Sequence, residues 1–307
     1  MSRPAVLIVQ RHLAPLSVFL EPTYDVFRLW EGPPIEARDA VRALIVAGEF
    51  PLDPVLVEGL PRPELIACFT SGHDGIDVAW CRERGLKVSH APGVNHEDVA
   101  DHAVGLILSS SRNIVSGDRS LRAGGWTPEA KSLSPSLRGK QIGIVGLGDI
   151  GQAVAKRAEV FGMDVAWWAP RDKAADWPRA DSLIDLARRS DILVVACRAD
   201  ETNRGLISAE VIEALGSDGL LVNVARGQLI DEDALIAALE SGKLGAAALD
   251  VFAEEPTDPA RWADVPNTVL TPHTAGATDQ AVQAMLRLLL ANLEAHFAGR
   301  DLVTEAR

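Results

Sequence analysis

Short apolar, β-rich runs alternate with stretches of helical periodicity through the first hundred residues. Three helical stretches lie between these runs, and Asp77 can cap the third while Gly85 can end it. Alternating β and α segments are typical of a parallel sheet with helices on its faces. The expected strands are 5–10, 24–30, 43–47, 64–70 and 86–91, and the expected helices are about 35–42, 53–60 and 77–84.

A second alternating series follows a long helical stretch at about 97–116 and a polar, glycine-containing stretch at 117–139, which we expect to be irregular. Its expected strands are 141–146, 164–169, 191–197, 219–225, 245–251 and 268–271, and its expected helices are 150–161, 182–189, 208–215, 231–241 and 277–298. The last helix has no partner in this second pattern, so we expect it to return to the first half.

The sequence therefore predicts an α/β protein of two Rossmann-like domains with parallel sheets. We expect a substrate (catalytic) domain formed by residues 1–98 and 281–307. A dinucleotide-binding domain, residues 99–280, would be inserted into it.

A glycine-rich turn stands at the centre of the second series. The apolar run 141–145 ends in Gly146, Gly148 and Gly151, spaced as GxGxxG, and a helical pattern follows. This strand–turn–helix setting is the one in which the fingerprint binds a dinucleotide. The glycines allow the tight turn, the approach of a pyrophosphate and close helix packing, and the helix N-terminus attracts the phosphates. The predicted contacts are Gly146, Leu147, Gly148, Asp149, Ile150 and Gly151.

The length, net charge and cysteine content of the chain bear on which classes of partner and location are expected. The 307 residues suggest about two domains. A net charge of −13 argues against nucleic acid or an anionic membrane as a partner. Three cysteines without a CxxC pair indicate reduced thiols, no metal site and a cytoplasmic protein. The first apolar run is too short for a signal peptide, and no run approaches the ~18 residues of a membrane span.

Three strand ends of the second series carry reactive side chains. Arg226 follows the strand 219–225, Asp250 lies at the end of 245–251 with Glu255 after it, and His273 follows 268–271. Each alone is compatible with an ordinary turn or a solvated loop. Because ligands of open α/β sheets bind at the carboxyl ends of the strands, the three together predict an active site there.

At these residues the chain resembles the D-isomer-specific 2-hydroxyacid dehydrogenases, from about Thr70 to Ala281, and among them most the glyoxylate/hydroxypyruvate reductases. The most specific segments are 223–227 (NVARG), 249–256 (LDVFAEEP) and 271–273 (TPH). The resemblance implies NAD(P)H-dependent reduction of a small 2-oxo acid to the D-2-hydroxy acid. It also implies an active site in a cleft between two similar domains, and usually a homodimer.

The resemblance also implies roles for individual residues. Arg226 would hold the substrate carboxylate and C2 oxygen, and His273 would protonate that oxygen as hydride arrives. Glu255 would orient His273 and raise its pKa, as a nearby carboxylate does. The backbone at Ser71 and Gly72 would also hold the carboxylate. The cofactor would be contacted by Cys197, Val224, Ala225 and Asp250, the last through the nicotinamide carboxamide.

The histidines divide by setting. His73 stands in the segment 70–74, where the family often has an aromatic or aliphatic residue, so the resemblance does not define substrate preference there. The remaining histidines have no setting comparable to that of His273, and we interpret them as structural: His12, His90, His96, His102 and His296.

The second strand of the series indicates which cofactor is used. NAD sites of this kind place an acidic residue at the end of that strand to bind the ribose 2′-OH. Here the position is Ala169, and Arg171 and Lys173 follow it. Because cations attract a 2′-phosphate, we expect NADP(H) to be preferred over NAD(H), although a solvated basic turn is the alternative.

Two other readings remain open from the sequence alone. A dehydrogenase-like fold can serve as a nucleotide-sensing scaffold that retains the catalytic residues, and the chain could also oxidise another small acid such as formate or phosphite. Formate would need no protonation of a C2 oxygen, so His273 favours a 2-oxo acid.

Overall fold

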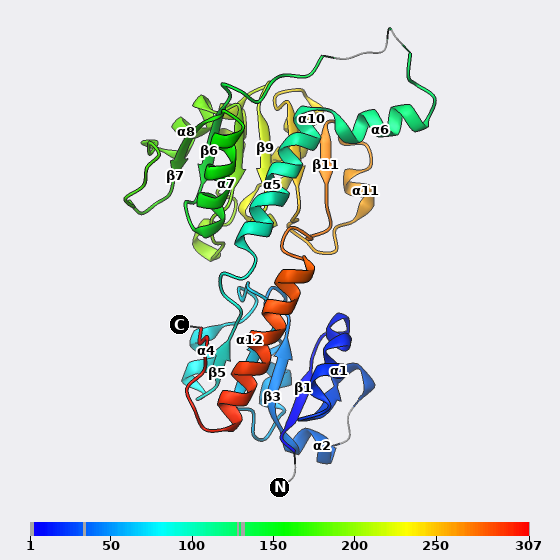
Figure 1. The fold of residues 1–307 in the computed structure, drawn as a ribbon, viewed down its shortest axis with the longest axis vertical. Coiled ribbons are helices and arrows are strands. Elements are labelled where there is room, and N and C mark those ends of the chain that lie inside the picture. Colours follow the sequence, from blue (N-terminus) through cyan, green and yellow to red (C-terminus); the bar gives the residue numbers. More distant parts are fainter. Residues whose placement is uncertain (1–2, 33–34, 128, 130–132, 307) are drawn as a thin grey trace. The chain divides into compact units, whose positions relative to one another are not determined.

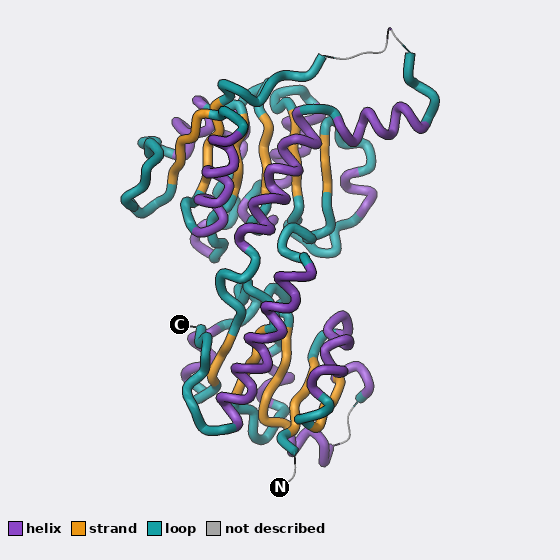
Figure 2. The backbone as a smooth tube through the Cα atoms, in the orientation of Figure 1, coloured by secondary structure: helices purple, strands orange, loops and turns teal. Residues whose placement is uncertain are grey.

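The chain forms two compact units in a computed structural model that describes residues 3–32, 35–127, 129 and 133–306 (Figure 1). The first unit comprises Met1–Asn95 and Thr278–Arg307, and the second comprises His96–Ala277. Each has its own parallel sheet with helices on both faces, as Figure 2 shows for the second unit, so the predicted fold class is confirmed.

The described residues of the first unit form a five-stranded sheet in the order β2-β1-β3-β4-β5, in which every neighbouring pair is parallel. Residues in β1 and β4 are buried along their whole length, which is typical of parallel strands covered on both faces. The strands are β1 (Ala5–Ile8), β2 (Asp25–Arg28), β3 (Val41–Val46), β4 (Leu65–Cys68) and β5 (Lys87–Ser89).

The final helix, α12 (Asp279–Phe297), belongs to the first unit. Its buried residues Ala281, Met285, Leu289 and Leu293 recur every four positions, and they share a core with strand residues such as Val6. Helix α1 and the preceding 3-10 turn contribute to the same core, whereas α3 and α4 pack in the core on the other face. The bounds are η1 (Arg11–Leu16), α1 (Ser17–Leu20), η2 (Leu29–Glu31), α2 (Ile35–Ala40), α3 (Pro54–Glu58) and α4 (Val78–Glu83).

The second unit contains a six-stranded parallel sheet in the order β11-β10-β9-β8-β6-β7. Along the chain, β6 is followed by its neighbour β7 on one side, and β8 then returns to its other side. This reversal between β6 and β8 is the switch point at which such sheets bind ligands. The strands are β6 (Gln141–Val145), β7 (Asp164–Trp168), β8 (Ile192–Val195), β9 (Leu220–Asn223), β10 (Ala246–Leu249) and β11 (Thr268–Leu270).

Helices cover both faces of this sheet (Figure 1). Helices α5 and α7 pack in one core with Ile144 and Val222, whereas α8, α9 and α10 pack in the other with Val145 and Leu221. None of the described helices combines the length and apolar content needed to cross a bilayer. The bounds are α5 (His96–Ser111), α7 (Asp149–Val160), α8 (Leu183–Arg189), η4 (Glu201–Asn203), α9 (Ala209–Leu215), η5 (Gly227–Leu229), α10 (Glu232–Glu240) and α11 (Pro259–Trp262).

The stretch after α5 differs from the expectation. A break at Asn113, whose φ is 52°, ends the predicted long helix and begins a separate helix, α6 (Ile114–Arg122). The expectation of irregular structure from 117 is therefore wrong at its start, and residues 128 and 130–132 of that stretch lie outside the described ones. Helix α6 buries none of its residues, so no apolar stripe facing this unit's core marked it in the sequence.

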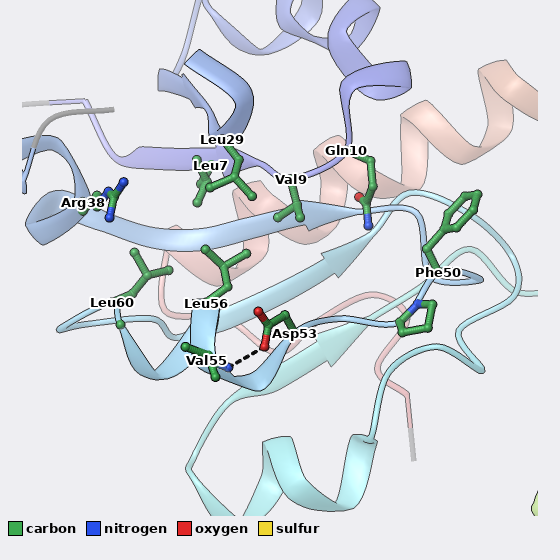
Figure 3. Close-up of a pocket in the computed structure, with 12 residues that line it drawn as sticks. Leu7, Val9, Gln10, Leu29, Arg38, Phe50, Asp53, Val55, Leu56 and Leu60 are labelled. Carbon is green, nitrogen blue, oxygen red and sulfur yellow. Dashed lines mark hydrogen bonds between the residues drawn. The ribbon is translucent and has the colours of Figure 1, made fainter. Parts of the chain in front are cut away.

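A pocket of about 640 Å³ opens in the first unit (Figure 3). Apolar side chains line most of it, among them Leu7 of β1 and Leu56 of α3, and its polar side chains are Gln10, Arg38 and Asp53. Asp53 already accepts the backbone N–H of Val55 at the start of α3. None of the residues predicted to bind substrate or cofactor lines this pocket.

Candidate active site

The glycine-rich turn lies at the switch point, directly after β6. A Cβ at Gly146, whose φ is 93°, would lie 2.5 Å from the Cα of Cys197, which follows β8. A Cβ at Gly151 would lie 2.1 Å from the carbonyl oxygen of Gly146, so only glycine fits at both positions. At Gly148 the same construction meets no atom within 4 Å, and this residue is the N-cap of α7 without a side-chain cap. The turn therefore has open space before a helix N-terminus, which suits a pyrophosphate.

The other predicted residues of the turn follow it into the helix. Leu147 is buried, Asp149 is the first residue of α7, and Ile150 packs at the edge of the core that α5 and α7 share. The turn thus combines a buried apolar anchor with backbone N–H groups at the start of the helix.

Cations gather after β7, where the acidic residue of the plain NAD pattern is replaced by Ala169. Arg171 is exposed, and Lys173 donates from Nζ to the carbonyl oxygen of Leu147 at 3.0 Å, which connects this loop to the glycine turn. Arg179, which the sequence reasoning did not single out, donates from Nη2 to the carbonyl oxygen of Ala169 at 2.8 Å.

The turn after β9 fixes Arg226. The fully buried Asn223 side chain accepts the N–H of Ala225 at 3.0 Å and donates to the carbonyl oxygen of Arg226 at 2.9 Å. A Cβ at Gly227 would lie 1.8 Å from the carbonyl carbon of Phe252, so the turns after β9 and β10 pack without side chains between them. Val224 and Ala225, both predicted to contact the cofactor, are buried in this turn. Asn223 is a supporting residue that the sequence reasoning missed.

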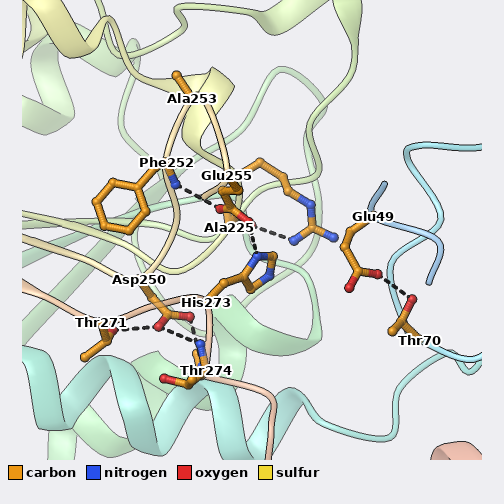
Figure 4. Close-up of polar contacts among 12 residues, drawn as sticks. Glu49, Thr70, Ala225, Asp250, Phe252, Ala253, Glu255, Thr271, His273 and Thr274 are labelled. Atoms are coloured by element: carbon orange, nitrogen blue, oxygen red, sulfur yellow. Dashed lines mark hydrogen bonds and ion pairs between the residues drawn. The ribbon is translucent and has the colours of Figure 1, made fainter. Parts of the chain in front are cut away.

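Glu255 and His273 form a direct pair (Figure 4). Nδ1 of His273 donates to Oε2 of Glu255 at 2.6 Å, and the N–H of Phe252 donates to Oε1 at 3.0 Å. The bond with Glu255 raises the pKa of His273 above its ordinary value, although burial opposes this change. Burial alone would raise the pKa of Glu255, but the bonds from His273 and Phe252 and the charge of Arg226 leave it lowered. The pair therefore favours a carboxylate beside a protonated imidazole.

Asp250 lies at the end of β10 and is 1% exposed. Its carboxylate accepts Oγ1–H of Thr271 at 2.6 Å and the N–H groups of Thr274 and Ala275, both at 2.9 Å. Burial favours its neutral form, but these bonds and His102 lower its pKa. Because Thr271 gives its proton to Asp250, its oxygen accepts from Nε2 of His102 at 2.9 Å. His102, which we interpreted as structural, thus supports the position of Asp250 through Thr271.

A second carboxylate supports the loop that carries Glu255. Glu232, at the start of α10, accepts the N–H of Ala253 at 2.5 Å and pairs with Arg261 at 3.2 Å. No sequence signal distinguishes Glu232 from an acidic residue in the first turn of a helix, so the sequence reasoning missed it.

Ser71 and Gly72 lie in the first unit, in the loop Thr70–Asp74 after β4, which we call the substrate loop. Nδ1 of His90 donates to the carbonyl oxygen of Ser71 at 3.0 Å, and the rings of His73 and His90 lie 4.4 Å apart. His90, which we interpreted as structural, holds this loop through that bond. The described residues contain no group of three or more metal-ligating side chains.

The second unit thus brings Arg226, Glu255 and His273 to the carboxyl ends of the neighbouring strands β9, β10 and β11, in the same sheet as the glycine turn. A parallel sheet with a dinucleotide turn at its switch point and a carboxylate-paired histidine beside an arginine defines a nucleotide-dependent oxidoreductase. Residues 104–275 match the family model of the D-isomer specific 2-hydroxyacid dehydrogenase NAD binding domain. The chain belongs to this family.

Named relatives agree with this assignment. The chain is 39% identical to glyoxylate/hydroxypyruvate reductase A HPR2 of Arabidopsis thaliana, and the match covers 95% of this chain and 96% of the relative. It is 38% identical, with the same coverage, to hydroxyphenylpyruvate reductase of Plectranthus scutellarioides. A solved NADPH-dependent glyoxylate/hydroxypyruvate reductase of Sinorhizobium meliloti, in complex with NADP and malonate, matches with a TM-score of 0.91 at 34% identity. That match covers 99% of this chain and 97% of the other.

Proposed function

We propose that this protein is an NAD(P)H-dependent reductase that converts glyoxylate or hydroxypyruvate to the corresponding 2-hydroxy acid, of D configuration where C2 is a stereocentre. The observation that carries the proposal is the Glu255–His273 pair, which favours a protonated imidazole at the end of β11, in the same sheet as Arg226. The relatives named as glyoxylate/hydroxypyruvate reductases support the substrate class.

The residues divide the chemistry among them. A guanidinium binds a carboxylate through two parallel N–H groups, so Arg226 would hold the substrate carboxylate, with the backbone of Ser71 and Gly72 as further donors. Reduction at C2 builds negative charge on the ketone oxygen. Nδ1 of His273 is bonded to Glu255, so Nε2 is the nitrogen that would deliver the proton. The bound dinucleotide supplies the hydride.

The cofactor would be held by the glycine turn and Cys197, with Asp250 on the nicotinamide side. The open space at Gly148 fits a pyrophosphate, and the cations after β7 fit a 2′-phosphate. We therefore propose that NADPH is preferred, and the solved relative in complex with NADP supports this proposal.

Two further properties belong to the proposal. We propose a homodimer, because apolar side chains are exposed on and after α6. We also propose a cytoplasmic location, because the three cysteines are free thiols. Cys68 and Cys81 are buried and Cys197 is partly buried, and burial raises the pKa of Cys197 to about 11, which favours an unreactive thiol.

A steady-state screen of glyoxylate, hydroxypyruvate, formate and phosphite with NADPH, NADH and their oxidised forms tests the function. We expect reduction of the two 2-oxo acids, fastest with NADPH, and no oxidation of formate or phosphite. Turnover of formate or phosphite alone would make the chain a dehydrogenase of another small acid. Tight cofactor binding without turnover of any substrate would favour the nucleotide-sensing scaffold.

A further inference from the structure

Two loops at the carboxyl edge of the first unit's sheet are locked together. Strands β3 and β4 are neighbours, so the segment Ala47–Phe50 after β3 lies beside the substrate loop. A Cβ at Gly48 would lie 2.4 Å from the carbonyl oxygen of Gly72, and one at Gly75 would lie 2.2 Å from that of Phe50. The N–H of Gly75 donates to the carbonyl oxygen of Gly48 at 2.8 Å. Backbone packs directly on backbone here, so the residue after Gly48 has a defined place.

That residue is Glu49, and its carboxylate is held against the substrate loop. The hydroxyl of Thr70 accepts the N–H of Gly48 at 2.9 Å and lies 2.7 Å from Oε2 of Glu49 and 3.0 Å from the carbonyl oxygen of Gly72. A hydroxyl has one proton to donate, and the shorter bond, to an ionised acceptor, is the stronger one. Thr70 therefore orients the Glu49 carboxylate (Figure 4).

The charge of Glu49 is notable because the family's substrates are anions. The carboxylate at C1 of a 2-oxo acid would be held by backbone N–H groups of the substrate loop. A second carboxylate on the substrate would be repelled by Glu49. A hydroxyl on C3, in contrast, could donate a hydrogen bond to it.

We propose that Glu49 is a specificity-determining residue, which favours 2-oxo acids with a hydrogen-bond donor on C3 and rejects those with a second carboxylate. The inference deepens the proposed function and rests on it. His73 on the substrate loop and His90, which is bonded to that loop, would act in the opposite direction, because an imidazolium would attract a second carboxylate.

The test compares kcat/KM for hydroxypyruvate, oxaloacetate and 2-oxoglutarate, each divided by kcat/KM for glyoxylate in the same variant. Glyoxylate has no C3, so this ratio removes general effects on folding, cofactor binding and catalysis. In the wild type we expect the ratio to exceed one for hydroxypyruvate and to be far below one for both dicarboxylates. Glu49→Gln should raise the dicarboxylate ratios at least about tenfold, because the repulsion is gone. It should also lower the hydroxypyruvate ratio by about threefold to tenfold, because a neutral acceptor is weaker.

Matched variants separate charge from structure. Glu49→Asp keeps the charge and should still reject dicarboxylates. Thr70→Val should loosen the discrimination, and Thr70→Ser should retain it, because only the latter keeps the hydroxyl. Glu58→Gln removes a carboxylate of the same unit that pairs with Arg84 on the surface, and it should leave all ratios unchanged.

Several outcomes would overturn the assignment. If Glu49→Gln still reduces glyoxylate and its kcat/KM ratios are unchanged, Glu49 has only a structural role. The proposed function would then remain intact. A wild-type preference for dicarboxylates, abolished in His73→Asn, would assign selection to the imidazoles. Failure of the wild type to reduce any 2-oxo acid would overturn the proposed function and this assignment together.

Discussion

The Glu255–His273 pair links an expected pH dependence of activity to a single hydrogen bond. Glu255 raises the pKa of His273, and reduction needs the protonated imidazole, so activity should be full below that pKa and fall as pH rises through it. Glu255→Gln removes the charge that raises the pKa. We therefore expect the alkaline fall of kcat/KM for glyoxylate to begin at a lower pH in this variant.

The pH profile of kcat/KM, measured from acid to alkaline pH, checks this expectation. His273→Asn is the control, because it should lose most of the activity and the titration with it. A profile that is the same in Glu255→Gln and in the wild type would assign the alkaline limb to another group.

Arg226 differs from a lysine in geometry more than in charge. Asn223 and Gly227 hold its turn in one conformation, so the guanidinium can present two N–H groups to a carboxylate. Arg226→Lys keeps the positive charge but loses the second bond, which is worth about 1.5–3 kcal/mol, or roughly 10- to 150-fold in kcat/KM. Steady-state kinetics with glyoxylate measure the loss. A kcat/KM equal to that of the wild type would place the carboxylate elsewhere.

At the scale of elements, the glycine turn contains a matched pair of positions. A Cβ at Gly151 would lie 2.1 Å from a backbone oxygen, whereas a Cβ at Gly148 would point into open space. Gly151→Ala should therefore lower the free energy of unfolding by roughly 1–3 kcal/mol, as overpacking does. Gly148→Ala should cost less stability, about 1 kcal/mol or below, because alanine is only a poorer N-cap. It should raise the cofactor Kd about tenfold, because the methyl group enters the space of the pyrophosphate.

Thermal melts and cofactor titrations of the two variants separate these effects. Equal stability of both variants would show that Gly151 is not closely packed. Unchanged cofactor affinity in Gly148→Ala would place the phosphates away from this turn.

The loop after β7 should determine the choice of cofactor. Arg171 is exposed beside Lys173, which the glycine turn already engages, so Arg171 is the cation available for a 2′-phosphate. Arg171→Ala should raise the KM for NADPH about tenfold and leave the KM for NADH nearly unchanged. Added salt should weaken NADPH binding more than NADH binding, because it screens the extra attraction. Equal losses with both cofactors would make this loop a solvated turn.

Much of the element pattern was accessible from the sequence, because parallel strands buried on both faces leave continuous apolar runs such as 220–223. The proposed catalytic trio was accessible because each member lies in the segment that follows a strand. Supporting contacts were not: Asn223, Glu232 and His102 act through bonds to residues that only folding brings near. Helix α6 was missed for a different reason, since it buries no residue and its start depends on the left-handed backbone of Asn113.

At the scale of the whole molecule, the apolar residues left exposed on and after α6 indicate a partner. Ile114 is 54% exposed, Leu121 57%, Trp126 73% and Leu133 99%, in a chain whose net charge of −13 otherwise favours solvation. Ile114 and Leu121 are seven residues apart and therefore lie on one face of α6. Exposed apolar clusters of this kind mark interaction sites, and we propose a second copy of the chain as the occupant.

Sedimentation at micromolar concentration should therefore show a dimer. Leu121→Asp puts a charge into the proposed interface, so it should shift the protein to monomers without lowering the melting temperature of the monomer core, because α6 buries no residue within the subunit. Val160→Asp is the matched control, since Val160 is 86% exposed at the end of α7 and the same substitution there should leave the dimer intact. A monomeric wild type, or a Leu121→Asp variant that dimerises as tightly, would exclude the α6 face as the interface.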